Sequence, residues 1–470
     1  MTSPPRPDSS GRSLVSCVTA CLAGCAWLPA SLLAARTASP QEPPPQSGHE
    51  APAAPAPAPQ TRREEPFLRG QLRSHYFVRW TGAQADNDLV ETLVLDAGHA
   101  DRDRVTGHLM GRLAWDIDGT DSTFASLSDA YGERVDALLY DAWIDLHEVS
   151  GCSLVRLGRQ SIQETPEVAF FDGAHVASEE FGSLGLQFGG YGGVSTHLYE
   201  SSRTGDLTAG AYAQLRPWSG GRLRVDYMHL EDETLLRSHD DDLLGAGFWQ
   251  SLGTWLQIDG QYSRLGDRDR DVQGHALCRV PEWGLVVRGS YYLLLEPQGD
   301  LVLEADPFFN AMNELHPYDQ WSVAVGDDVV KSLYLEGGAD VRRVRDTADI
   351  GFYNRDYDRY HATARWYDVL VTGLRLAGTF DYWDATEQTV SSGGGDVGYE
   401  FGATTASLGT FYSLYKFDLF SNSERDHVRT WFARLRHKTS AALVLECDYE
   451  LEDNDFDQYH RLRLGATWNF

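Results

Sequence analysis

The last ten residues of the chain alternate between apolar and polar side chains. The even positions from Leu462 to Phe470 are apolar and end in two aromatic residues, and the odd positions from Arg461 to Asn469 are polar or glycine. A period of two residues is that of a β-strand, whose side chains point to opposite faces. A strand that is apolar on one face and charged on the other suits a wall between lipid and water. We therefore predict a strand of an outer-membrane β-barrel.

The same alternation continues through the chain from Phe67 to the C-terminus. Segments of roughly ten alternating residues are separated by polar or Gly-rich turns, and proline is rare inside them, as strands require. Clear examples are residues 68–80, 105–117, 374–382, 431–436 and 443–451. The pattern predicts an all-β protein built as a transmembrane antiparallel β-barrel.

Residues 67–470 are available for this barrel. A strand with its share of loop takes roughly 22 residues in such proteins, so we expect about 16 to 18 strands. A barrel of that width is not filled by its own side chains, and its inner face should be polar. A soluble sandwich or propeller would also alternate. An export signal, the aromatic terminal residue and aromatic residues near strand ends, such as Trp80 and Trp115, favour the membrane.

The first 66 residues are predicted to lie outside the barrel. Residues 1–39 have the features of an export signal peptide, with arginines ahead of an apolar stretch. Two processing sites stay open: cleavage near residues 35–39, which we favour, and lipoprotein processing at Cys25. Residues 40–66 are rich in Pro and Ala and should form an extended periplasmic linker. The barrel is then expected over residues 67–470.

Composition narrows the function further. The net charge of −29 and the pI of about 4.8 argue against nucleic acid as a partner. After the N-terminus no apolar run approaches the roughly 20 residues that a spanning helix needs. The cysteines form no metal-binding or disulfide pattern, and no nucleophile motif such as GxSxG occurs. We expect no enzyme activity, no metal and no cofactor.

One stretch carries sharper motifs. It contains Ala142-Trp143-Ile144-Asp145-Leu146, then Leu157-Gly158-Arg159-Gln160, then Phe171-Asp172-Gly173. This stretch, residues 139–176, resembles the alginate-export family of outer-membrane porins, in which an A-W/Y-x-D-L strand precedes an L-x-L-G-R-Q strand and an F-D-G segment. The resemblance implies an 18-stranded barrel that passes an anionic polysaccharide or a smaller solute.

The resemblance also implies arginines that line an electropositive constriction, where a guanidinium can hold a carboxylate in a fork. Arg156 and Arg159 match its motif, but their odd separation puts them on opposite faces of a regular strand. Either the strand bulges near Gly158 or Arg159 lies at the rim. Arginines on other polar faces join them. The predicted pore-lining set is Arg69, Arg73, Arg112, Arg156, Arg159, Arg365, Arg375, Arg434, Arg436, Arg461 and Arg463.

Two further expectations concern the charge of the lumen. Closing the barrel pairs the first strand with the last, so we predict that Arg69 and Arg73 lie near Arg461 and Arg463. Carboxylates could also face inward and neutralise the arginines. The candidates are Asp141, Asp145, Asp226, Asp259, Glu446 and Glu450.

The sequence thus predicts a porin or channel in the outer membrane of a Gram-negative-type bacterium. It should pass anionic polysaccharide or small solutes by diffusion through an arginine-bearing lumen. Expected partners are outer-membrane lipid and lipopolysaccharide, the barrel-assembly machinery through the C-terminal Phe470, and the solute itself. Two alternatives stay open: a barrel enzyme that acts on lipid, and a structural or adhesion barrel whose lumen is plugged.

Overall fold

The computed structural model describes most of the chain after the linker. The described residues are 67–82, 84–118, 134–196, 205–233, 238–297, 316–351, 354–385, 388–418 and 423–470. The predicted signal peptide (residues 1–39) and linker (residues 40–66) lie outside them, so both stay predictions. Within the described ranges, no helix is long and apolar enough to cross a membrane.

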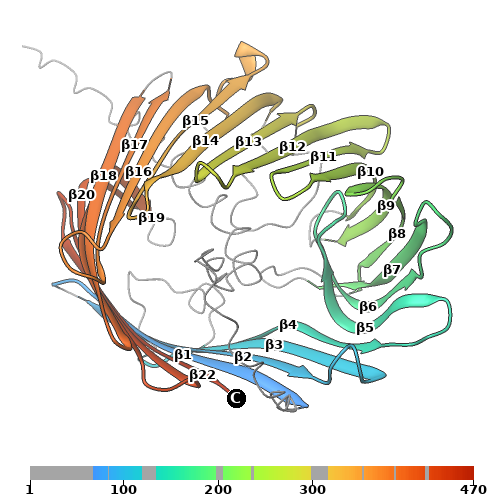
Figure 1. The fold of residues 1–470 in the computed structure, drawn as a ribbon, viewed down its shortest axis with the longest axis horizontal. Helices are drawn as coiled ribbons and strands as arrows, with labels where there is room; N and C mark the ends of the chain where they lie inside the picture. The colour runs from blue at the N-terminus through green and yellow to red at the C-terminus, as the bar shows by residue number, and fades with distance from the viewer. Residues whose placement is uncertain are drawn as a thin grey trace, which may run out of the picture.

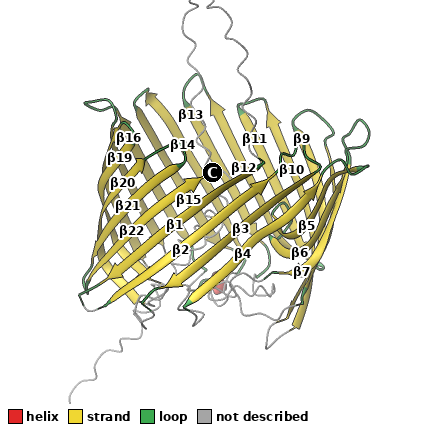
Figure 2. Cartoon of the chain, turned by 90° about the horizontal axis from the view of Figure 1, so that it is seen from below, coloured by secondary structure: helices red, strands yellow, loops and turns green. Residues whose placement is uncertain are grey.

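The described residues form one antiparallel sheet of 22 strands that closes on itself (Figures 1 and 2). Each strand pairs with its neighbours in sequence, and the first strand also pairs with the last. A short 3-10 helix, η3 (Thr347–Asp349), lies between the fifteenth and sixteenth strands. The strands are β1 (Leu68–Trp80), β2 (Ala85–Ala97), β3 (Val105–Asp116), β4 (Val135–Leu146), β5 (Cys152–Ile162), β6 (Ala169–Ser178), β7 (Gln187–Ser195), β8 (Leu207–Leu215), β9 (Gly221–Glu233), β10 (Ser238–Leu252), β11 (Leu256–Leu265), β12 (Arg268–Val280), β13 (Leu285–Leu294), β14 (Tyr318–Val330), β15 (Leu333–Val344), β16 (Tyr357–Tyr367), β17 (Leu374–Ala385), β18 (Gln388–Phe401), β19 (Thr404–Asp418), β20 (Ser423–Lys438), β21 (Leu443–Asp453) and β22 (Gln458–Asn469).

The strand count corrects the expectation of 16 to 18 strands and the 18 that the alginate-export resemblance implies. The chain spends fewer residues on each strand than expected, because 404 residues (67–470) shared among 22 strands give about 18 each. Several connections are only two residues long, such as 331–332 between β14 and β15 and 402–403 between β18 and β19. An even number of strands and the closed antiparallel order are as predicted.

The two faces of the sheet differ as the alternation predicts. On the outer face large apolar side chains remain exposed, for example Leu408 at 63% and Trp321 at 56%. On the inner face charged side chains pair across neighbouring strands, as Arg375 does with Asp396. A closed wall of exposed leucine, valine and aromatic side chains is stable in hydrocarbon rather than in water. The chain is therefore an outer-membrane β-barrel.

The start of β1 and the end of β22 lie at one end of the barrel, which we call the terminal end; the other is the loop end. Turns at the terminal end are short, and three of them carry exposed tryptophans, Trp218, Trp255 and Trp283. Such residues favour the membrane–water interface, where the ring is apolar and the indole N–H meets water. They belong to an aromatic girdle at this end.

The seam between β1 and β22 is sealed at the C-terminus (Figure 1, where blue meets red). The backbone N–H of Gly70 donates to the carbonyl of Phe470 at 2.8 Å, and the N–H of Phe470 donates back at 3.0 Å. A Cβ atom at Gly70 would collide with the Phe470 ring. Glycine at 70 therefore lets the terminal ring lie close against the first strand.

The face assignment gives a direct test. We expect Leu408→Arg, which puts a charge on the outer face, to lower the free energy of unfolding by about 2–4 kcal/mol. Ser407→Glu is the matched control, since this adjacent residue faces the lumen opposite Arg434, and a carboxylate there should change stability little. Urea unfolding in lipid vesicles, followed by tryptophan fluorescence, measures both. Equal losses for the two variants would contradict the assignment.

Candidate functional site: the inner wall of the barrel

Most of the predicted arginines lie on the inner face of the barrel. Strand register and alternation place ten of the eleven there: Arg69, Arg73, Arg112, Arg156, Arg365, Arg375, Arg434, Arg436, Arg461 and Arg463. This is a statement about position. Whether these side chains act on a solute stays a prediction.

The inner faces of β20, β21 and β22 form a charge ladder. Carboxylates of β21 lie between arginines of the two neighbouring strands, and Glu450 is shared by one arginine from each side. Opposite charges directly across a strand pair stabilise the pairing and cancel one another's field. The pairs are Arg434–Glu450, Arg461–Glu450, Arg463–Asp448 and Arg436–Glu446.

Two more predicted arginines are paired in the same way. Arg156 holds Asp145 in a fork, with N–O distances of 2.7 and 2.8 Å, and its guanidinium lies 4.2 Å from the centre of the Trp143 ring. Arg375 pairs with Asp396 at 2.6 Å. Because each of these arginines already has a carboxylate, the inner wall is far less electropositive than a count of its arginines indicates.

Arg159 departs from the predicted pore lining. Its neighbour across β4 is Ala142, on the outer face, and it forms a fork with Asp172 at 2.7 Å. Gly158 has a φ of +122°, yet the alternation of β5 continues through it. Because Arg156 faces the lumen and Arg159 is three residues further along a regularly alternating strand, Arg159 lies on the lipid-facing side.

The predicted basic seam is also corrected. β1 and β22 pair as expected, but they run antiparallel, so the start of one meets the end of the other. Arg461 lies opposite Arg79, and Arg463 lies opposite Phe77. Arg73 lies opposite Thr467, nearer the terminal end, and its Nε donates to Gln71. Arg69 and Arg73 thus sit at a different height from Arg461 and Arg463, and the β1 arginine that meets Arg461 is Arg79.

Three predicted arginines make no ion pair with any residue that the structure describes. They are Arg73, whose Nε donates to the neutral Gln71, Arg112 and Arg365. Arg365 is exposed on β16, and its guanidinium lies 5.7 Å from the centre of the Tyr334 ring. In these three side chains the inner-wall charge is least neutralised within the predicted set.

A segment that the sequence did not single out narrows the lumen. Residues 163–168, between β5 and β6, fold inward against the inner faces of β9 to β12; we call them the strap. Glu164 pairs with Arg222 and Arg224, each at 3.0 Å. Glu167 pairs with Arg270 at 2.6 Å.

Backbone and packing contacts hold the strap as well. Gln261 and Arg270 donate to the carbonyls of Thr165 and Pro166, at 3.2 and 3.3 Å. A Cβ atom at Gly245 would lie 2.5 Å from the Pro166 ring. Glycine at this position lets the strap approach the wall closely.

An apolar cluster anchors the base of the strap. It lies on the inner side of the wall and consists of Ile162, Ala169, Phe171, Tyr191, Met228, Leu243 and Leu265, all buried. The sequence does contain a signal for this cluster, namely apolar residues on the face of a strand that is otherwise polar. Met228, which shares the inner face of β9 with Asp226, is an example. An inner-face cluster of this kind needs a covering segment, because apolar groups would otherwise meet lumenal water.

Arg224 and Asp226 are the most buried ion pair at the strap. Both side chains are 5% exposed, with N–O distances of 2.7 and 2.8 Å. The Arg224 guanidinium also lies 3.9 Å from the centre of the Tyr212 ring. Asp226 was a predicted inward carboxylate, and its partner, on the same strand, was not in the predicted set.

Three carboxylates lie close together at the loop end. Oxygens of Asp86, Asp116 and Asp118 lie within 4.8 Å of one another. The Arg79 guanidinium pairs with Asp86 and with Asp88. One carboxylate of the group, Asp86, is thus already paired with a fixed cation, and we assign no metal.

Comparisons with known proteins add no family. No family model matches the chain, and no curated protein sequence matches it. The alginate-export resemblance is thus not confirmed.

The chain is similar to solved structures only at low scores. OccK3 (OpdO) of Pseudomonas aeruginosa has 12% identity and a TM-score of 0.40, over 86% of this chain and 95% of its own. The translocation pore of the P pilus usher (PapC) has 11% and 0.49, over 86% and 99%. The outer membrane protein OpdK of Pseudomonas aeruginosa has 11% and 0.40, over 86% and 98%. At these scores we draw no conclusion about this chain from the similarity. The barrel architecture is established by the pairing of its strands.

The buried pair at the strap should matter more for stability than the charge ladder. We expect Asp226→Asn to lower the free energy of unfolding by about 3–5 kcal/mol, because it leaves Arg224 buried with one partner fewer. Glu446→Gln, in the half-exposed ladder, should cost about 0–1 kcal/mol. Urea unfolding in vesicles compares them. A loss for Glu446→Gln as large as that for Asp226→Asn would refute the ranking.

Proposed function

We propose that the barrel is a passive outer-membrane channel for hydrophilic solutes. The observation that carries this is the inner wall, where ion pairs such as Arg463–Asp448 are partly exposed, at 41% and 15% of their side chains. Charged groups in that state need water beside them, since an ion in a dry interior carries a large desolvation penalty. A barrel of 22 strands is also too wide for its own side chains to fill.

The strap supports a restricted rather than an open pore. Wide barrels of this strand number are commonly obstructed inside. The strap covers the inner faces of four neighbouring strands and is fixed there by two acidic residues, Glu164 and Glu167. We propose that it sets the size of solute that passes.

The narrower proposal concerns anions. An anionic polysaccharide or a small anion would be guided by the arginines without a carboxylate partner, Arg73, Arg112 and Arg365, rather than by all ten inward arginines. A fixed cation in a confined pore attracts carboxylates and repels other cations. The paired arginines would instead keep the wall rigid and polar.

A plugged structural barrel is the second candidate, because the same strap that restricts a pore could belong to a closed lumen. A channel conducts ions across the membrane, whereas a plugged barrel does not.

Planar-bilayer recording decides between these candidates. We expect the full chain to give discrete conductance steps, because a water-filled lumen carries ions. In a potassium chloride gradient the reversal potential should show anion preference, reduced in Arg365→Gln. No steps would refute the channel, and cation selectivity of the wild type would refute only the anion proposal.

The role of the strap has its own test. We expect Glu164→Gln with Glu167→Gln to increase the unit conductance, because the strap loses its three ion pairs to the wall. Glu446→Gln removes a carboxylate from the inner wall without touching the strap and should leave the conductance near that of the wild type. An unchanged conductance in the double variant, folded as judged by gel mobility, would show that the strap does not set the width.

A further inference from the structure

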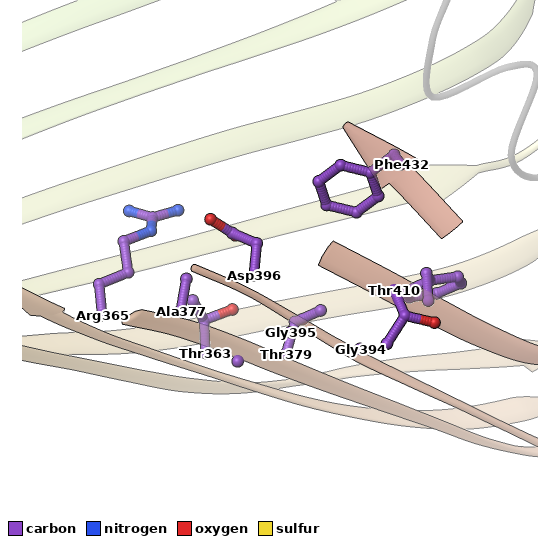
Figure 3. A pocket seen from close by; sticks show the side chains of 11 residues that line it. Thr363, Arg365, Ala377, Thr379, Gly394, Gly395, Asp396, Thr410 and Phe432 are labelled. Atoms are coloured by element: carbon purple, nitrogen blue, oxygen red, sulfur yellow. The ribbon is translucent and has the colours of Figure 1, made fainter. Parts of the chain in front are cut away.

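A pocket of about 260 Å³ opens in the inner wall over β16 to β20 (Figure 3). It lies near the middle of these strands, at a depth where a passing solute crosses the membrane. Its lining is Thr363, Arg365, Ala377, Gly378, Thr379, Gly394, Gly395, Asp396, Thr410, Phe411 and Phe432. The predicted pore-lining set includes one of these residues, Arg365.

Small residues form the floor of the pocket. Ala377 and Gly394 lie on adjacent strands, where larger side chains elsewhere fill the inner face. A Cβ atom at Gly394 would lie 2.5 Å from the Thr410 carbonyl oxygen and 2.8 Å from the Phe411 ring. Glycine at 394 therefore lets the ring lie close to the wall and leaves a shallow, flat recess beside it.

The two sides of the pocket differ in chemistry (Figure 3). Phe411 and Phe432 lie on one side. Arg434 already covers one face of Phe432, at 4.4 Å from the ring centre, whereas Phe411 is 36% exposed. An exposed aromatic ring beside a flat recess favours contact with another flat ring.

The other side carries one available positive charge. Asp396 is engaged by Arg375, so this pair is close to neutral. Glu336, whose charge acts on Arg365, is already engaged by Arg288 at 2.6 Å and by the Tyr334 hydroxyl at 2.5 Å. The Arg365 guanidinium therefore makes no ion pair with the described residues and is free to bind an anion.

We propose that this pocket binds a solute consisting of a single aromatic ring with one carboxylate. The ring lies in the recess beside Phe411, and the carboxylate receives hydrogen bonds from Arg365. The hydroxyls of Thr363 and Thr379 supply polar contacts from the floor. A recess that combines an aromatic side with a few convergent polar groups is a common form of a small-molecule site. The inference rests on the proposed channel, through which such a solute would reach the pocket.

Calorimetric titration of the full chain in detergent micelles tests the site, with benzoate as the probe. We expect Arg365→Gln to weaken benzoate binding about 10-fold or more, because a charge-assisted hydrogen bond is lost. Ala377→Phe, which fills the recess but keeps the arginine, should weaken it as well. Arg279→Gln is the matched control, because this arginine lies on the inner face of β12 and lines no part of the pocket; binding should stay at the wild-type level.

Two further probes separate the ring from the charge. Benzamide, which has the ring without the charge, should bind at least 10-fold more weakly than benzoate. Glucuronate has the charge on a polar, puckered ring, and tighter binding of glucuronate than of benzoate would overturn the aromatic assignment. Benzoate affinity unchanged in Arg365→Gln would overturn the site.

The test is independent of the proposed channel. Binding in micelles needs no ion flow, so benzoate binding by a chain without conductance steps would support the pocket and refute the channel. Conductance steps with no benzoate binding would refute the pocket alone.

Discussion

Closure of the strand ladder is the constraint on which the rest of the structure depends. In hydrocarbon no water can satisfy a backbone N–H or C=O group, so a sheet that spans a membrane cannot leave an edge. Pairing of β1 with β22 removes the two edges. The contact of Gly70 with Phe470 completes it, because the last residue of the chain exchanges two backbone hydrogen bonds with the first strand.

Closure also fixes what each face must do. The outer face contacts lipid and is mostly apolar, with the Arg159–Asp172 pair as an exception. The inner face encloses a space that 22 strands make too wide to fill. Its polar residues therefore need partners, and they find them across strands, as Glu450 does with Arg434 and Arg461. The apolar cluster at the base of the strap also needs a partner, and the strap covers it and shields it from water in the lumen.

Much of the fold could be predicted from single strands. Alternation along β22 places Arg463 inward and Leu464 outward, because a strand has only two faces. The same rule, applied strictly, also places Arg159 opposite to Arg156, although a motif resemblance favoured both in the pore. The predicted number of strands was wrong. The number of strands depends on turn lengths, and a two-residue turn such as 331–332 leaves little mark in the sequence.

The sequence by itself determined the local properties: the period of two, the face of each side chain, and a barrel that belongs in a membrane. These follow from the chemistry of adjacent residues. Only the tertiary structure decided which charges meet. Register pairs Arg461 with Glu450 and sets it opposite Arg79, while Arg365 keeps its charge available. Such pairings join residues of different strands, some in one hairpin and some across the closure, so no pattern within one strand contains them.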